Sequence, residues 1–361
     1  MIFALLGAVV VVLAGGAPTR AATSFEGLNR ALTDGVVIPA YQRFAVATAA
    51  LEPALGAFCA APTPASLAAA RQAFATAMDG WQQAQPIVFG PARSSGAASA
   101  VQLVPYGRDA ITRQVNQAVA AMDPALVAPG GLAGKSIALT GFPALERLLY
   151  DDDLPVKTPT PEAEYACALA LAVARNLAGI SAGILDEWQR PGGFRETVLT
   201  AAAGNDVYYD AEEVAADLLQ SLHAALDVAI AVKLERALGH SLESARPTRL
   251  ESWRSQLSLA NLRSNLTTAE ALYAADGGFG EVLVASPGGA ALDQAIRQRL
   301  AHVVALLDSI EGPLAVAIRQ PAERPKVEQL LAELRALRRS LRNELAPAIG
   351  LVIGFNATDG D

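Results

Sequence analysis

The stretch 159-PTPEAEYACALALAVARNLAGISAGILDEWQRPGG-193 indicates the fold class most clearly. Alanine and leucine, which favour helices, dominate it and the rest of the chain, whereas aromatic and β-branched residues are sparse. Proline is tolerated in the first turn of a helix, while Pro191-Gly192-Gly193 should end one. We therefore expect one long helix from Glu162 to about Gln189.

The same helical spacing of apolar residues continues on both sides of this stretch. Thr63 or Ser66 can cap a helix that runs to about Gln83, and Pro39 should kink or divide the helix that contains it. The other expected helices are Asn29–Ala60, Arg108–Ala121, Lys135–Tyr150, Ala211–Leu238, Arg249–Ala274, Leu292–Ile318 and Ala322–Leu345. No stretch alternates with period two for long enough to predict a sheet, so the chain is predicted to be all-α.

The order of the helices predicts two domains. Each half of the chain offers about four substantial helices, and four antiparallel helices with short links form a bundle. We expect two four-helix-bundle-like domains, 23–193 and 194–361, packed side by side with a cleft between them. Two similar halves suggest an internal duplication, although the sequence similarity that supports it, between Ala144–Tyr150 and Ala269–Tyr273, is weak.

Composition and motifs exclude several classes of protein. The 361 residues are 52% hydrophobic and 18% charged, which is the opposite of a disordered chain. The net charge is −8 and no basic stripe stands out, so nucleic-acid binding is not expected. The three histidines, His223, His240 and His302, stand alone without an HExxH pattern, and GxSxG, GxGxxG and P-loop patterns are absent.

The N-terminus predicts export. The apolar run Ile2–Ala14 is too short to span a bilayer comfortably, and Thr19–Ala22 offers a plausible cleavage site. We interpret 1–22 as a secretory signal peptide, although no Lys or Arg precedes the apolar run; an uncleaved anchor is the alternative. The protein is then expected in the periplasm, without a stable transmembrane span in its mature chain.

Cys59 and Cys167 are the only two cysteines, and both lie in apolar, apparently helical stretches. An exported protein reaches an oxidising compartment, where a disulfide persists. We favour a disulfide that ties two helices together over two separately buried thiols. Two cysteines without a CxxC pair exclude a zinc finger.

The segment Gly141-Phe142-Pro143-Ala144-Leu145-Glu146 is the first candidate site. Proline costs about 3 kcal/mol inside a helix, so a helix should be interrupted here or begin near Gly141. Pro143 and Glu146 share a helix face at i and i+3, and Arg147 follows. A carboxylate among apolar neighbours requires a cation, a metal or a proton, which makes Glu146 a weak metal candidate; a structural salt bridge is the alternative.

A second candidate lies within the predicted helix Arg249–Ala274, which carries unusually many polar side chains. By their spacing of three or four, Arg254, Ser258 and Asn261 should lie near one face. This face is either solvated or lines a polar cleft, and Trp253 argues against full exposure. The candidate residues are Trp253, Arg254, Ser255, Ser258 and Asn261.

Four segments, in order along the chain, resemble those of imelysin-like proteins. Gly141–Tyr150 resembles the family signature, and the other three segments are Trp81–Pro91, Trp253–Ser255 and Gly354–Asp361. The resemblance implies an exported or outer-membrane-associated bacterial protein built from two helical bundles. Several members are linked to iron uptake, and some were described as peptidases.

The family motif is Gly-x-His-x-x-Glu. Gly141 matches its glycine and Glu146 its glutamate, but Pro143 stands at the histidine position. Proline can neither ligate a metal nor move a proton, which argues against metallopeptidase chemistry. The resemblance thus implies a non-enzymatic role in iron or haem uptake, with iron or haem as possible ligands and uptake or envelope components as partners. A metallopeptidase that uses Glu146 and a histidine from elsewhere, and a structural envelope protein, are the alternatives.

Overall fold

The computed structural model describes residues 25–102, 108–151 and 160–352. Within these ranges the chain forms helices and connecting turns and no strand, which confirms the all-α prediction. The predicted signal peptide, 1–22, and the C-terminal segment Gly354–Asp361 lie outside the described residues.

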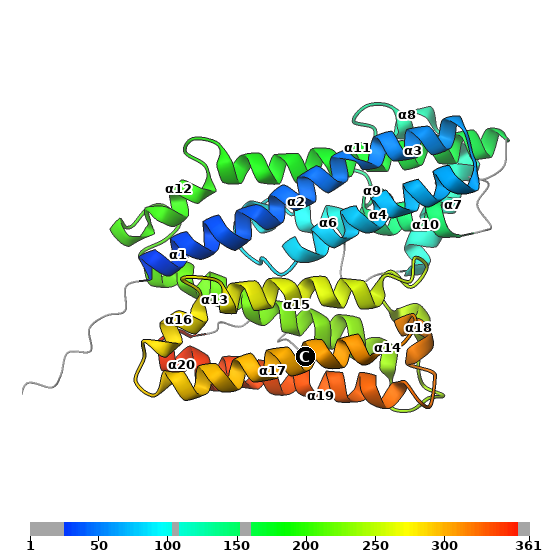
Figure 1. Cartoon of the computed structure of the whole chain (residues 1–361). Helices are drawn as coiled ribbons and strands as arrows, with labels where there is room; N and C mark the ends of the chain where they lie inside the picture. Colours follow the sequence, from blue (N-terminus) through cyan, green and yellow to red (C-terminus); the bar gives the residue numbers. More distant parts are fainter. Residues whose placement is uncertain (1–24, 103–107, 152–159, 353–361) are drawn as a thin grey trace, which may run out of the picture.

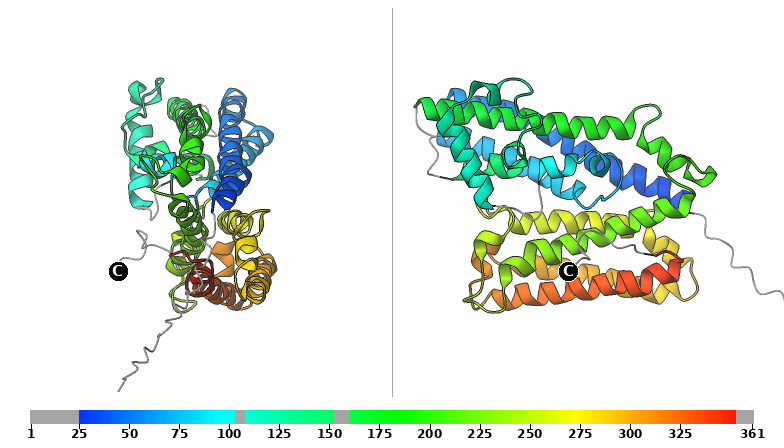
Figure 2. Two further views of the ribbon diagram at one scale, coloured as in Figure 1. Left: turned by 90° about the vertical axis from the view of Figure 1, so that its left-hand side faces the viewer. Right: turned by 180° about the vertical axis from the view of Figure 1, so that it is seen from behind.

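The helices are arranged in two groups, one above the other in Figure 1, and the views in Figure 2 show the same separation. The first group consists of α1 (Glu26–Leu32), α2 (Ile38–Ala49), α3 (Leu51–Ala60), α4 (Pro64–Ala84), α5 (Pro91–Ser94), α6 (Ala97–Val101), α7 (Arg108–Ala121), α8 (Pro124–Val127), α9 (Ile137–Thr140), α10 (Phe142–Tyr150), α11 (Pro161–Gln189) and α12 (Phe194–Leu199). The second consists of α13 (Ala211–Asp227), α14 (Arg236–Leu238), α15 (Ser258–Ala274), α16 (Phe279–Val284), α17 (Gly289–Ser309), α18 (Leu314–Ala317), α19 (Arg324–Ser340) and α20 (Ala346–Ile349). The domain limits at 23, 193 and 194 stay a prediction.

The seam between the two groups is formed mainly by α15 against α4 and by α13 against α1. Polar side chains of α15 reach the backbone of α4: Asn265 Nδ2 donates to the carbonyl oxygen of Gln82 at 2.6 Å, and Thr268 Oγ1 to that of Gln83 at 2.8 Å. Asn265 is wholly buried and Thr268 nearly so. These hydrogen bonds fix the register of one helix against the other.

The predicted cap at the start of α4 is confirmed. Thr63 and Ser66 cap α4 reciprocally, because the side chain of each accepts a hydrogen bond from the backbone N–H of the other. Thr160 Oγ1 accepts from the N–H of Ala163 at the start of α11. Because these caps depend on residues only three positions apart, the sequence alone could reveal them.

Pro39 does not divide its helix. The chain remains helical from α1 into α2, and a π-helical turn, Thr33–Val37, precedes the proline. Pro39 is the second residue of α2, where the missing proline N–H is tolerated. The irregularity is therefore a wider turn rather than a break.

Two predicted helices were too long. The helix expected over Arg249–Ala274 begins only at Ser258, because Ser252 and Gln256 adopt positive φ angles of 50° and 61° in the preceding turn. The helix expected over Leu292–Ile318 ends at Ser309, before the Gly312-Pro313 pair, and α18 follows as a separate short helix. The first error matters for function, since it removes Trp253, Arg254 and Ser255 from the helix.

One local structure occurs in both helix groups. Gly192–Glu196 and Gly277–Glu281 share the pattern Gly-Gly-Phe-x-Glu. In each, the first glycine has a φ near +70° and the second caps a six-residue helix, α12 or α16. A wholly buried aromatic residue, Trp188 or Tyr273, lies five positions before the second glycine. This repeat supports the hypothesis of an internal duplication, with α11 and α15 as counterparts.

Three helical runs of the described chain are long and apolar enough to cross a membrane, judged by length and composition alone: Glu26–Ala60, Pro161–Leu199 and Ala211–Leu238. Between 28% and 72% of their most apolar windows is buried inside the protein. Their buried faces belong to the common hydrophobic core, in which Phe44, Leu177 and Leu222 take part. The absence of a membrane span from the mature chain stays a prediction.

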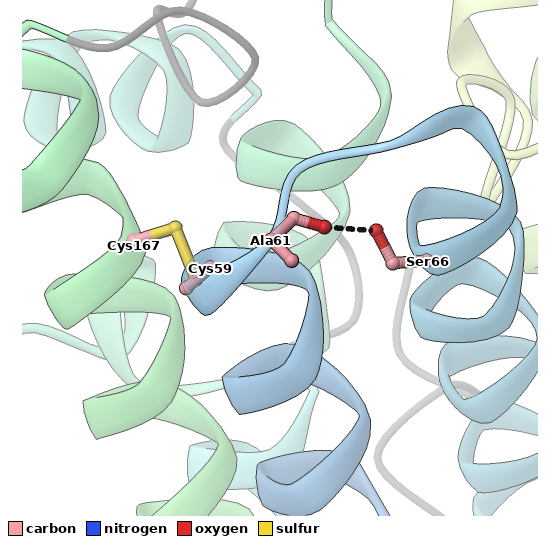
Figure 3. The surroundings of a disulfide bond; sticks show 4 residues. All are labelled: Cys59, Ala61, Ser66 and Cys167. Carbon is pink, nitrogen blue, oxygen red and sulfur yellow. Dashed lines mark hydrogen bonds between the residues drawn. A yellow bond between two sulfur atoms is a disulfide. The ribbon is translucent and has the colours of Figure 1, made fainter.

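Cys59 and Cys167 form the predicted disulfide (Figure 3). It joins α3 to α11, with the two Cα atoms 5.9 Å apart and 108 positions between them in sequence. A crosslink over such a long loop restricts the unfolded chain strongly.

We expect Cys59→Ser/Cys167→Ser to lower the free energy of unfolding by about 2–5 kcal/mol, because the unfolded chain regains its freedom. Urea unfolding of both proteins, with and without a reductant, measures this. The reductant should destabilise the wild type and leave the double variant unchanged; equal stability of the two proteins in oxidising buffer would contradict the prediction.

Candidate functional site

The motif glycine and proline shape the start of α10. Gly141 is the residue before the first turn, and Pro143 is the second residue of the helix, where its missing N–H is harmless. A Cβ atom on Gly141 would lie 2.2 Å from the carbonyl oxygen of Val101 and 2.7 Å from that of Ala100. The predicted interruption is therefore confirmed, and the glycine is needed because the end of α6 approaches its backbone closely.

Glu146 lies on α10 and its side chain faces the second helix group. Only 6% of the residue is exposed. Its Oε1 accepts two hydrogen bonds from Ser255, one from the backbone N–H at 2.9 Å and one from Oγ at 2.7 Å. Burial raises the pKa of the Glu146 carboxyl, and the two hydrogen bonds from Ser255 offset only part of this. The two hydrogen bonds to this buried carboxyl thus come from neutral donors of Ser255, and burial shifts the group toward its protonated form.

Arg147 does not neutralise Glu146. Its guanidinium pairs with Asp151 at the end of the same helix, and its Nη2 donates to Asn116 Oδ1 at 3.2 Å. Asp151 Oδ2 also accepts from Arg254 Nε at 2.7 Å. This carboxylate thus joins an arginine of the first helix group to one of the second.

Arg254 lies in the turn before α15 rather than on that helix. Its Nη2 donates to Thr112 Oγ1 at 3.1 Å, and its guanidinium carbon lies 4.6 Å from the ring centre of Trp253. Arg254 therefore does not share a helix face with Ser258 and Asn261, contrary to the prediction. The spacing argument failed because the chain is not helical at residue 254.

Ser258 and Asn261 hold this turn in place. Ser258 Oγ donates to the carbonyl oxygen of Glu251. Asn261 Nδ2 donates to Glu251 Oε2 at 2.7 Å and to Ser252 Oγ at 3.0 Å. Both residues are buried, so the predicted polar face is not solvated. Its side chains position the segment that carries Ser255 to Glu146.

A further group of buried polar residues adjoins this turn and was missed by the sequence analysis. Lys233 comes from the π-helix Val228–Glu235, and its Nζ lies 2.9 Å from Glu251 Oε2. Gln102 Oε1 accepts from Trp81 Nε1 at 2.6 Å and from Gln82 Nε2 at 3.1 Å. A lysine inside the apolar run Val228–Leu234 was the signal that could have revealed this group.

A small cavity of about 20 Å³ lies beside Glu146. Its lining comes from both helix groups: Met78, Gln102, Ile111, Pro143, Glu146, Leu250, Ser252, Trp253 and Arg254. A space of this size holds about one water molecule. Two larger hollows, of about 510 and 420 Å³, lie along α11 and share Gly179 and Ile180 in their walls.

In the part of the chain that the structure describes, no three His, Cys, Asp or Glu side chains are gathered to hold a metal ion. Pro143 lines the cavity at the position of the motif histidine. His223 lies on α13, where its Nδ1 is 2.9 Å from Asp227 Oδ2.

These features define a class of protein: two groups of helices joined along a buried polar seam, with an interrupted helix that carries a motif glycine and a buried motif glutamate. The family model described as Imelysin, Peptidase M75, matches residues 37–341. The chain belongs to the imelysin family.

Individual relatives agree with this assignment. The chain is 29% identical over 243 residues to Iron-regulated protein A of Synechococcus elongatus, which covers 66% of this chain and 62% of that relative. Two solved structures share the fold. An imelysin-like protein of Psychrobacter arcticum has a TM-score of 0.73 at 21% identity, covering 91% of this chain and 98% of its own. An iron-regulated protein A precursor of Parabacteroides distasonis has a TM-score of 0.74 at 15% identity, covering 91% and 96%.

We expect Gly141→Ala to lower the free energy of unfolding by about 3 kcal/mol, because its Cβ would overlap the backbone of α6. Gly179→Ala is the matched control, since nothing lies within 4 Å of a Cβ there and alanine favours helix α11. Chemical denaturation of both variants checks this. If Gly141→Ala were as stable as Gly179→Ala, the close approach would not explain the glycine.

Glu146→Gln should change how stability depends on pH. The folded protein binds the proton of the Glu146 carboxyl more tightly than the unfolded chain does, and in the unfolded chain the pKa of this carboxyl is near 4.5. Its contribution to stability is therefore largest below that pH and falls as the pH rises. The glutamine amide of the variant would keep an acceptor for Ser255 without the titrating proton. We expect the wild type to lose stability relative to Glu146→Gln as the pH rises above 4.5, measured by urea unfolding; a constant difference would contradict the raised pKa.

Proposed function

We propose that this protein is an exported, non-enzymatic component of iron acquisition that binds a small ligand or a partner protein at the seam around Glu146. Membership of the imelysin family supports the proposal, and so does the relative called Iron-regulated protein A. The Parabacteroides distasonis protein is described as a precursor, which favours export of that relative. The apolar segment Ile2–Ala14 favours export to the periplasm here.

The replacement of the motif histidine by Pro143 is the observation that carries the non-enzymatic assignment. A general base must accept a proton from a water or substrate within hydrogen-bonding reach. Burial raises the pKa of the Glu146 carboxyl, and its Oε1 already accepts two hydrogen bonds from Ser255. These contacts favour binding or positioning over proton abstraction, and they count against the metallopeptidase alternative.

The size of the cavity restricts the ligand. About 20 Å³ beside Glu146 accommodates a water molecule or a single ion, whereas a porphyrin would require the seam to open. We therefore favour a partner protein or a small species over haem at this position.

A structural role in the envelope is the second candidate, and one contact favours it. Glu146 and Ser255 are 109 positions apart in sequence, and their two hydrogen bonds join the helix groups. If Glu146 only joins the two helix groups, its loss should impair function solely by lowering the stability of the protein. Function and stability must therefore be measured on the same variant.

The test is a deletion strain of the source bacterium complemented with the wild type, Glu146→Ala, or Glu187→Ala, which changes an exposed carboxylate. We expect the protein to become more abundant under iron limitation. We also expect the deletion strain to grow more slowly than the parent strain when iron is limiting. Wild type and Glu187→Ala should restore growth, and Glu146→Ala should not. Purified wild type should show no hydrolysis of casein.

Two measurements separate the alternatives: titration of the purified wild type with ferrous iron and with haem, and the melting temperature of Glu146→Ala. A lost growth phenotype with an unchanged melting temperature would exclude the purely structural role. Expression indifferent to iron, together with no binding of iron or haem, would overturn the proposed role in iron acquisition. Metal-dependent hydrolysis of casein would restore the peptidase alternative.

A further inference from the structure

Lys233 is the most deeply buried cationic side chain at the seam. It belongs to the π-helix Val228–Glu235, and its side chain is 2% exposed. Its neighbours in sequence, Val228 to Val232 and Leu234, are apolar. A lysine in such a place is costly unless oxygen atoms surround its ammonium group.

Oxygen acceptors from both helix groups meet at the Lys233 ammonium. Glu251 Oε2 lies 2.9 Å from Nζ, and Gln82 Oε1, from α4, accepts a close hydrogen bond from the same atom. Glu251 and Gln82 are themselves buried. Carboxylate and amide oxygens are also the ligands that bind hard metal ions in proteins.

The same group of residues has more acceptors than donors. Glu251 Oε1 and Asn265 Oδ1 are both buried and lack a hydrogen-bond partner. The Glu251 carboxylate is also close enough to Glu146 to disfavour ionisation of that acid. Lys233 supplies the positive charge among these oxygen atoms through Glu251 Oε2 and Gln82 Oε1.

We propose that the Lys233 ammonium is a built-in cation, which fills an oxygen-lined position at the seam that would otherwise accept a cation from solution. It neutralises Glu251 and links that carboxylate to α4 through Gln82. This inference holds whichever ligand the protein binds, so its failure would leave the proposed role in iron acquisition standing.

Burial lowers the pKa of the Lys233 amine, while the Glu251 carboxylate acts in the opposite direction. Removal of Glu251 would therefore leave a buried amine without its counter-ion, and removal of Lys233 would leave a buried carboxylate without its cation. Each single change should harm the protein more than the loss of both charges together.

Chemical rescue of Lys233→Ala tests the proposal. The variant should melt at a lower temperature than the wild type, because Glu251 loses its cation. Ethylammonium chloride should restore part of the loss, beyond the effect of sodium chloride at equal concentration, since the small cation can enter the space vacated by the side chain. Mn²⁺ should also bind to the variant, seen as loss of the free-ion signal in electron paramagnetic resonance, and not to the same site in the wild type.

Two controls make the result specific. Lys233→Ala/Glu251→Gln lacks the anion as well, so it should melt above Lys233→Ala and gain nothing from either cation. Lys326→Ala breaks an ion pair with Glu323 at the start of α19, where the lysine is one-third exposed, and should show no rescue. If Lys233→Ala does not fold unaided, the soluble yield on refolding with and without ethylammonium replaces the melting temperature.

Specific rescue by ethylammonium or Mn²⁺ that depends on Glu251 is the expected result. The proposal is overturned if neither cation affects Lys233→Ala more than the double variant. It is equally overturned if wild-type protein binds Mn²⁺ in a manner that Glu251→Gln abolishes, because the position would then not be filled by the lysine.

Discussion

Buried polar groups along the seam between the two helix groups find partners mainly within the protein, because burial shields them from bulk water. Glu146 meets Ser255, Lys233 meets Glu251 and Gln82, and Asn265 meets the backbone of α4. All of these contacts except Lys233–Glu251 join residues more than 100 positions apart in sequence. An apolar seam would allow the helices to slide, whereas these directional bonds select one register.

The charges at the seam are balanced locally. Asp151 is shared by Arg147 and Arg254, and Glu251 is paired with Lys233. Glu146 is left without a cation of its own, and burial therefore favours its protonated form. Glu146 is therefore held by the neutral donors of Ser255 rather than by an ion pair with Arg147.

The motif segment has a second role that is purely steric. Gly141 lets the end of α6 lie against the start of α10, and Pro143 begins that helix without losing a hydrogen bond. These two residues thus fix the position of the α10 backbone that carries the Glu146 side chain. Glu146 thus extends from the helix start in the first group to the turn 251–256 in the second, where Ser255 donates to it.

The sequence by itself determined the helical class, the cap at Thr63, the interruption at Gly141 and the disulfide between the only two cysteines. These features depend on residues a few positions apart or on the composition, so they can be read without the fold. Only the tertiary structure decided that residues 251–256 form a turn and that Ser255 meets Glu146 across 109 positions. Polar side chains there form hydrogen bonds with residues far away in sequence rather than within one helix. The spacing of residues along a helix contains no information about a partner in another segment.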